Sequence, residues 1–450
     1  MVPSAAYGAT MLGSAAMNNV WVTYSIPFFS SRLSSSSFFL GQALYMVWNA
    51  LNDPLIGWIS DMSPGLMRRR IPAIRYGGPL WALVFSLSWL DWGDEGHKGS
   101  FLSAIHFTLA LCAYDGLLTT VELNHGALLA DISSSVEDRT KLNQASAIGA
   151  VIGSCSSFFG HMYWNPVPGA DLHLFRRFSA VVSLISALAF TYSAHGISRH
   201  EQSLELKEKL EETSSELHHK ASTRKSVAIV MKQLWNHKNL GVFECTFEKN
   251  FLSSFVDVLL VDLSRKTRSL IISTSFILPW LTTILVGPFV NKHGVYRLLQ
   301  IAFTLKLMLS MVALCIGYKH QVFIGLFAVA TRVLTECVCR QDKYLHIRDR
   351  SMSATVMGTN ALFTKPGESL APMLGWAILN YRSSDSKGIG QGQGQQTTLF
   401  YCLVLGPLFV ASAQLLRGEY LGKVKEFINQ KDLEVALSTG ASVFPSYKET

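Results

Sequence analysis

Long apolar runs limit most strongly what this chain can fold into. Stretches such as 298–316, 322–338 and 399–416 approach the roughly 20 residues that a helix needs to cross a hydrocarbon core about 30 Å thick. Hydrophobic residues make up 49% of the 450 residues and charged residues only 16%, which favours one membrane protein over two or three soluble domains. We therefore expect an all-α polytopic membrane protein.

Twelve candidate spans fall into two sets of six with a charged segment between them. The sets are 5–29, 38–61, 76–92, 100–131, 143–164 and 174–196, then 239–263, 269–290, 294–317, 320–339, 351–380 and 397–416. Two six-helix bundles around a midplane cavity are the layout of the major facilitator fold, which we expect here. The expected domains are an N-terminal six-helix bundle at 1–198, a cytoplasmic linker with an amphipathic helix at 199–238, a C-terminal six-helix bundle at 239–418 and a cytoplasmic tail at 419–450.

The basic residues predict an orientation in the membrane. The net charge is +8, but clusters such as Arg68, Arg69 and Arg70 stand in short loops between apolar runs, so we expect no nucleic acid as a partner. Loops that would be cytoplasmic in a chain with both termini inside hold the larger share of lysine and arginine. We expect a monomeric, multi-pass protein of the plasma membrane with both termini cytoplasmic and no removable signal peptide.

Many ionisable residues fall inside the candidate spans. Each costs roughly 2.5–3.5 kcal/mol at the centre of a spanning helix, so such residues usually face a cavity or a partner. The set is Asp53, Asp115, Glu122, Glu244, Glu248, Lys249, Asp257, Lys306, Arg332, Glu336, Lys365 and Glu368. A lipid-facing surface has no room for all of them, and an aqueous interior is therefore expected.

The second span places three polar side chains beside a helix breaker. Asn49, Asn52 and Asp53 are spaced i, i+3 and i+4, so their oxygens share one helix face. Pro54 cannot bond to the carbonyl of Ala50, which is thereby freed beside that face. This arrangement predicts a cradle for a small cation. The alternative is that Asp53 only stabilises the kink at the proline.

The fourth span carries a second polar stripe. Asp115, Thr119 and Glu122 are spaced i, i+4 and i+7, a pattern that suits a cation or a polar solute. In the eleventh span, Lys365 precedes Pro366 and Gly367 and would pair with a neighbouring acid or reach the acidic stripe across the cavity. Glu122 and Lys365, with Asp115, are the expected substrate-binding residues.

The remaining polar features have simpler explanations. Arg332 and Glu336 lie one helical turn apart and are expected to neutralise each other. The seven cysteines are scattered without a paired framework. The chain lacks a Ser/His/Asp set, an H-E-x-x-H motif, a Gly-rich phosphate loop and a zinc spacing, so we expect neither an enzyme nor a metal or organic cofactor.

Several segments resemble known transporters. "WNALNDPLIGW", "LTTVEL" and "LFTKPG" resemble the second, fourth and eleventh helices of the glycoside–pentoside–hexuronide:cation symporters, typified by the melibiose permease. The longer blocks "CAYDGLLTTVELNHGALLADI", "DRTKLN", "TRVLTE" and "TKPGESLAPMLGW" resemble the transmembrane protein 180 family of major facilitator proteins, in the same order and over nearly the whole chain.

The resemblance to the symporters implies roles for particular residues. The cation site would consist of Asn49, Asn52, Asp53 and Thr119, although an aspartate stands in the symporters at the place of Asn49. Of the two aspartates that bind sugar there, one corresponds to Glu122. The other corresponds to Ala15, which offers no polar group.

These observations predict a secondary-active transporter. It would carry a small polar or amphipathic solute, a lipid being one candidate, by alternating access, with Na⁺ or H⁺ as a possible coupling ion. The alternative is a non-transporting membrane scaffold or surface protein that keeps the transporter fold. The tenth helix is expected to end near residue 339, shorter than in the relatives.

Overall fold

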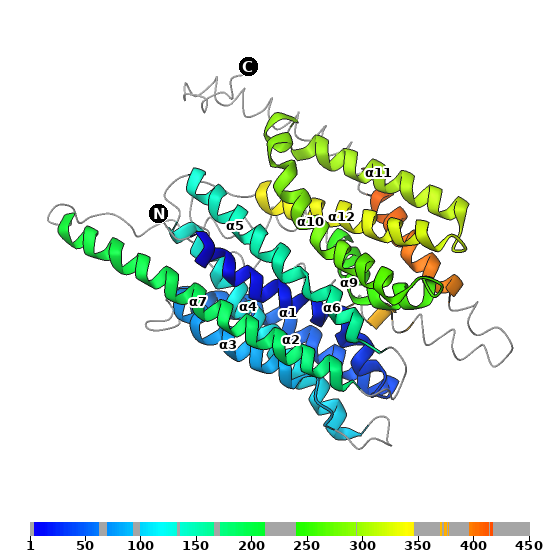
Figure 1. The fold of residues 1–450 in the computed structure, drawn as a ribbon, viewed down its shortest axis with the longest axis horizontal. Coiled ribbons are helices and arrows are strands. Elements are labelled where there is room, and N and C mark those ends of the chain that lie inside the picture. Colours follow the sequence, from blue (N-terminus) through cyan, green and yellow to red (C-terminus); the bar gives the residue numbers. More distant parts are fainter. Residues whose placement is uncertain are drawn as a thin grey trace, which may run out of the picture.

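The computed structural model describes residues 4–62, 70–92, 100–132, 136–165, 172–211, 240–293, 295–345, 370, 373–375, 377, 396–413 and 415–416. These residues are almost entirely helical and contain no strand. Helices of the first half of the chain form one group, and helices of the second half form another beside it (Figure 1). This arrangement confirms the expected fold class.

The N-terminal group has seven helical segments. They are α1 (Ser4–Ser30), α2 (Ser35–Met62), α3 (Arg70–Leu87), α4 (Phe101–Ile132), α5 (Val136–Ser154), α6 (Ser156–Tyr163) and α7 (His173–Glu211). The second group contains α9 (Leu240–Leu259), α10 (Arg265–His293), α11 (Val295–Ile316) and α12 (Gln321–Leu345), together with helical residues 396–413. The expected eleventh span lies almost wholly outside the described residues.

Two expected helices differ in the structure. The fifth span is broken at Cys155 into α5 and α6, and the hydroxyl of Ser156 donates to the carbonyl of Ala16 at the break. The tenth span does not end near residue 339, because α12 continues to Leu345. The added segment "RQDKYL" has neither glycine nor proline and consists mainly of residues that favour helices, so the helix continues.

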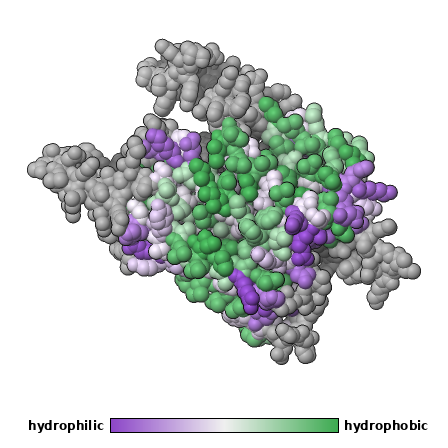
Figure 2. Space-filling view, in the orientation of Figure 1, coloured by the Kyte–Doolittle hydropathy of each residue, from purple (hydrophilic) through white to green (hydrophobic). Residues whose placement is uncertain are grey.

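The surface of α2 has the reverse of a soluble helix's polarity. Beyond the two serines of its first turn, its exposed side chains are apolar and follow the helical repeat: Leu40, Leu44, Val47, Trp48, Leu51 and Leu55. Its buried polar side chains are Gln42, Asn49, Asn52, Asp53 and Ser60. On the face shown in Figure 2, hydrophobic residues cover a broad area in the middle. Apolar residues outside and polar residues inside are what a lipid environment requires.

Three described helices are long and apolar enough to cross a membrane by length and composition: 101–129, 173–198 and 396–413. The last part of α7 continues beyond this apolar stretch to Glu211, past the expected domain boundary at residue 198. Shorter apolar helical stretches of the described residues lie at 250–259, 300–316 and 321–334.

Within the N-terminal bundle, α1 and α5 touch through their backbones. A Cβ atom added at Gly149 would overlap the carbonyl oxygen of Gly8, and one added at Gly153 would overlap the carbonyl oxygen of Leu12. Small residues allow this close approach of two helices, which favours van der Waals packing in a membrane. The two helices therefore form one tightly packed unit.

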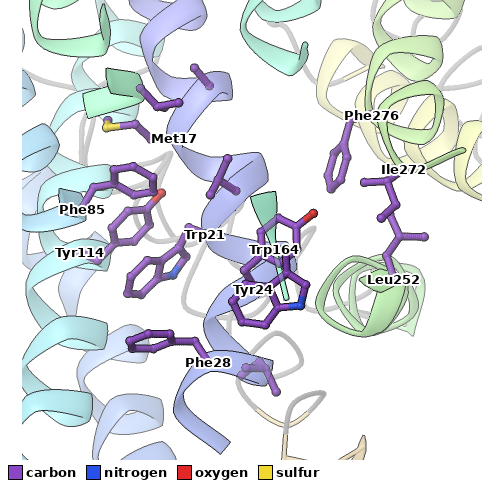
Figure 3. Close-up of a cluster of buried hydrophobic side chains, with 14 of the residues drawn as sticks. Met17, Trp21, Tyr24, Phe28, Phe85, Tyr114, Trp164, Leu252, Ile272 and Phe276 are labelled. Carbon is purple, nitrogen blue, oxygen red and sulfur yellow. The ribbon is translucent and has the colours of Figure 1, made fainter. Parts of the chain in front are cut away.

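Helix α1 lies between an aromatic core and the second bundle. On one side, Trp21 stacks on Tyr114 of α4 with ring centroids 4.0 Å apart. On the other side, Tyr24 packs near Trp164 and faces residues of the second bundle such as Leu252 (Figure 3). Helix α1 contacts α9, and α5 and α6 contact α10. We call the end of the molecule at which α1 ends and α2 begins distal, and the other end proximal.

Candidate functional site

The polar face of α2 packs against α4. The two helices are in extensive contact, and Asn49, Asn52 and Asp53 are buried between them and the rest of the bundle. The spacing of these residues therefore puts them where the sequence predicted, on one inward-facing side of the helix. Pro54 lies within α2, which runs without interruption from Ser35 to Met62.

Hydrogen bonds join α2 to α4 at this face. The amide nitrogen of Asn52 donates to Oδ2 of Asp115 at 2.8 Å and to the hydroxyl of Thr119 at 3.1 Å. The hydroxyl of Thr119 donates to Oδ1 of Asp53 at 2.8 Å. One amide and one hydroxyl thus link two carboxylates that are only 8% and 7% exposed, those of Asp53 and Asp115. The structure brings these four residues together, and we name them the α2–α4 cluster.

The α2–α4 cluster contains an acceptor without a donor. Oδ1 of Asn52 is buried and has no hydrogen-bond partner among the residues that the structure describes. An unsatisfied buried acceptor costs about 1–3 kcal/mol. Carboxylate, amide and hydroxyl oxygens are the ligands of hard cations, so the residues present suit a small cation such as Na⁺. Asn49, on the same helix face, is 1% exposed.

The expected solute residues are placed differently. Asp115 belongs to the α2–α4 cluster through its bond to Asn52. Glu122 is half-buried and lies farther along α4, where its Oε1 accepts a hydrogen bond from the hydroxyl of Ser14 on α1. The neighbouring Ala15 is buried and apolar. A serine one position before Ala15 therefore supplies the contact between α1 and Glu122.

Aromatic rings surround this part of the bundle. The hydroxyl of Tyr114 donates to Oδ1 of Asn18 at 3.5 Å, beside the stack of Tyr114 on Trp21. One turn beyond Glu122, the ring of His125 stacks on Tyr7 with centroids 4.1 Å apart, and the Tyr7 hydroxyl donates to the His125 carbonyl. His125 therefore packs against α1, as the simpler interpretation of a lone histidine expects.

The second bundle contributes buried cations. Arg332 of α12 is 2% exposed, and its guanidinium carbon lies 4.7 Å from the centre of the Phe276 ring on α10. Lys306 of α11 is 1% exposed. The side chains of Glu336 and Lys365 lie outside the described residues, so the expected pairs Arg332–Glu336 and Glu122–Lys365 stay predictions.

Sequence reasoning missed two of these contacts. Spacing along one helix relates Asn52 to Asp53, but it gives no information about Ser14, which is 108 residues from Glu122. The stacking of Arg332 on Phe276 also joins two different helices. The polar Ser14 directly before the aligned Ala15 is the sequence signal that would have indicated the first contact.

Comparisons with known proteins agree with this architecture. Residues 6–338 match the family described as MFS/sugar transport protein. Transmembrane protein 180 of Gallus gallus is 33% identical over 422 residues, which are 84% of this chain and 81% of that protein.

Solved transporter structures share the fold at low sequence identity. A bacterial homolog of the human lysosomal transporter Spinster, inward-facing and unoccupied, superposes with a TM-score of 0.59 at 13% identity, covering 93% of this chain and 97% of that chain. A D-xylose–proton symporter gives 0.56 at 13% identity, with 91% and 95% covered. At such identities these matches show the fold alone.

Proposed function

The chain belongs to the major facilitator family, in the branch of transmembrane protein 180, and from this we propose a secondary-active transporter that couples solute movement to a cation. It is a multi-pass integral membrane protein whose family and structural neighbours are transporters. The proposed solute is small and polar or amphipathic. The proposed location is the plasma membrane, and the proposed orientation has both termini in the cytoplasm.

The α2–α4 cluster carries this proposal. Two buried carboxylates, Asp53 and Asp115, are linked through Asn52 and Thr119, so their negative charges are close in a medium of low dielectric. Their mutual repulsion favours a bound positive charge. The buried Oδ1 of Asn52 supplies a neutral ligand for the same ion. We propose Na⁺ as the ion, held by Asn49, Asn52, Asp53, Asp115 and Thr119.

Glu122 is the proposed solute contact in the N-terminal bundle. It is half-buried, whereas Asp53 is buried, so it is the more accessible of the two carboxylates. A sugar hydroxyl or an ammonium group would donate to its carboxylate. If H⁺ is the coupled ion instead, Glu122 is the group that would carry it.

Sodium binding tests the ion site without knowledge of the solute. Purified protein is incubated with radioactive sodium, and bound ion is measured for the wild type, Asp53→Asn and the control Asp91→Asn. Asp91 is a carboxylate at the distal end that pairs with Arg32 at 2.6 Å, away from the cluster. We expect Asp53→Asn to abolish binding and Asp91→Asn to preserve it. Equal binding by all three proteins would refute the ion site.

Uptake by proteoliposomes tests transport itself. Radiolabelled D-xylose, glucuronate, a nucleoside and a lysolipid are offered under an imposed Na⁺ gradient, an imposed H⁺ gradient or none. We expect at least one solute to accumulate with a gradient, and Glu122→Gln to reduce its accumulation. If the H⁺ gradient alone drives accumulation, the coupling ion is H⁺ and not Na⁺.

A non-transporting scaffold is the second candidate. It is favoured by Ala15 and Asn49, two positions at which charged residues of the symporters are absent, and by Ser14, which already engages Glu122. A scaffold would show neither uptake nor thermal stabilisation by Na⁺ or by any of the four solutes.

A further inference from the structure

At the distal end, one carboxylate of the C-terminal bundle faces the N-terminal bundle. Oδ1 of Asp257 on α9 lies 3.7 Å from Nε2 of His161 on α6 and 3.4 Å from a guanidinium nitrogen of Arg268 on α10. The side chains of His161 and Asp257 are 3% and 12% exposed. Arg268 is in the same bundle as Asp257, so the contact with His161 is the one of the two that crosses between the bundles.

Two hydrogen bonds cross the same boundary nearby. The hydroxyl of Ser253, one turn before Asp257, donates to the carbonyl of Thr23 on α1 at 3.0 Å. The guanidinium of Arg265, the first residue of α10, donates to the carbonyl of Met162 at 3.5 Å. Both lie near the distal ends of their helices. These contacts join the bundles on the distal side of the molecule.

The same boundary region buries polar atoms that are left unsatisfied. The helices that meet here, α1, α6 and α10, carry five such atoms without a hydrogen-bond partner among the described residues: Oη of Tyr24, Nδ1 of His161, Oγ of Ser157, Oγ of Ser269 and Nε of Arg268. Each costs free energy while it is dry, and water entering between the bundles would satisfy it. The closed arrangement is therefore held by a few polar contacts and opposed by several unsatisfied groups.

We propose that His161 and Asp257 form a latch that holds the distal side closed and breaks when the bundles separate there. The imidazole of His161 lies against the carboxylate of Asp257 across the boundary, at 3.7 Å, and the guanidinium of Arg268 holds the same carboxylate oxygen from within the C-terminal bundle, at 3.4 Å. On opening, Asp257 stays with Arg268 while His161 and Tyr24 become hydrated. A small energy difference between the closed and open arrangements is what a transporter with two access states requires. This proposal rests on the proposed function of transport by alternating access. It identifies the contact that closes the distal side of the transporter.

Thiol labelling at position 253 measures the opening directly. Ser253 is 1% exposed and lies in the boundary, so a cysteine there reacts only when the distal side opens. Ser253→Cys protein in lipid nanodiscs is treated with a membrane-impermeant maleimide at one fixed pH, and modification is read by peptide mass, which separates it from the native cysteines. Asp257→Asn and His161→Phe, each added to this background, should raise the labelling rate by about 5- to 10-fold, and tenfold corresponds to about 1.4 kcal/mol.

Matched variants separate a latch from general loosening. Asp91→Asn removes contacts with Arg32 and Arg176 at the same end of the molecule but within one bundle, so the labelling rate should stay within about twofold of the wild type. The double variant of His161 and Asp257 should label no faster than either single variant, because both remove one shared contact. Arg265→Ala, a change at an exposed residue with little risk to folding, should raise labelling moderately.

The outcomes bear on the latch separately from transport. Unchanged labelling in both Asp257→Asn and His161→Phe, or an equal rise in Asp91→Asn, would overturn the latch. Additive effects in the double variant would overturn it as well. Labelling as expected together with an absence of solute uptake would leave the latch standing and count against the proposed transport function.

Discussion

The hydroxyl of Thr119 on α4 donates to the carboxylate of Asp53 on α2 across 2.8 Å, between two residues 66 positions apart in the chain. The same hydroxyl accepts a hydrogen bond from Asn52, so it orients both the amide and the carboxylate of α2. A single side chain on α4 therefore determines how the polar face of α2 is presented. Ion binding at this face should therefore depend on the Thr119 hydroxyl.

Replacing Thr119 should weaken Na⁺ binding. Thr119→Val preserves the side-chain volume and removes a hydrogen bond to a charged group, which is worth about 1.5–3 kcal/mol. We expect the dissociation constant for Na⁺ to rise about tenfold or more in the binding assay with radioactive sodium. Thr119→Ser keeps the hydroxyl and should bind within about threefold of the wild type. Equal affinity in both variants would remove Thr119 from the site.

Adding a carboxylate at position 49 should strengthen Na⁺ binding. Asn49 lies on the same face of α2 as Asp53, and an aspartate there restores the second-helix carboxylate of the symporters. The extra charge increases the Coulomb attraction for a cation in a low-dielectric site. We expect Asn49→Asp to lower the dissociation constant for Na⁺ about tenfold. Thermal stability in sodium chloride compared with choline chloride is a second measurement, and no change in either would contradict the assignment.

The contact between Ser14 and Glu122 should matter for solute more than for stability. Ser14→Ala removes a donor from Glu122 and should change the apparent solute affinity in uptake measurements about fivefold or more. The control is Thr10→Ala, one turn earlier on α1, whose hydroxyl pairs with the Ser193 hydroxyl at 2.7 Å. It should lower thermal stability to a similar degree and leave solute affinity unchanged. The same change in affinity for both variants would indicate a structural role alone.

The close contact between α1 and α5 should make Gly149 intolerant of a side chain. The methyl group of Gly149→Ala would overlap the carbonyl oxygen of Gly8, so the helices must move apart, at a cost of about 1–3 kcal/mol. We expect a clear loss of melting temperature in detergent. Gly77→Ala is the control, because its methyl group would meet the Val121 side chain at 3.4 Å, an ordinary contact. A loss in Gly77→Ala as large as that in Gly149→Ala would count against the backbone contact.

The helices themselves were largely predictable from hydropathy. Apart from 351–380, of which the structure describes only a few residues, each expected span coincides with helix in the described residues. Helix ends were less predictable, because the residues beyond an apolar run also favour helices, as at the end of α12 and of α7. The break at Cys155 has no proline or glycine beside it on the carboxyl side, and hydropathy gives no sign of it.

The α2–α4 cluster was predictable in part. Helical spacing alone placed Asn49, Asn52 and Asp53 on one face of α2, and a second spacing placed Asp115 and Thr119 on one face of α4. Spacing does not say which two faces meet, and Asp115 was therefore grouped with the solute residues. The hydrogen bond from Asn52 to the carboxylate of Asp115 follows from how α2 and α4 pack against each other.

Contacts between the bundles were beyond sequence reasoning. Asp257 was expected to face an interior because it is a charge in an apolar span, but its neighbour His161 is 96 positions away and stood in no motif. The identity of such partners depends on the angle and depth at which whole bundles meet. A pattern confined to one helix does not contain that information.

The backbone contact between α1 and α5 limits where the molecule can bend. Bending between α1 and α5 would separate the backbones that are in contact at the glycines. The two helices are therefore expected to move as one rigid unit. Helix α1 carries Ser14 and Thr23. Helix α6, which follows α5 after the break at Cys155, is tied to α1 by the hydrogen bond from Ser156 to Ala16 and carries His161, so the solute contact and the N-terminal half of the distal latch are both attached to α1. A tilt of these helices that breaks the contact of His161 would therefore also reach the neighbourhood of Glu122 through α1.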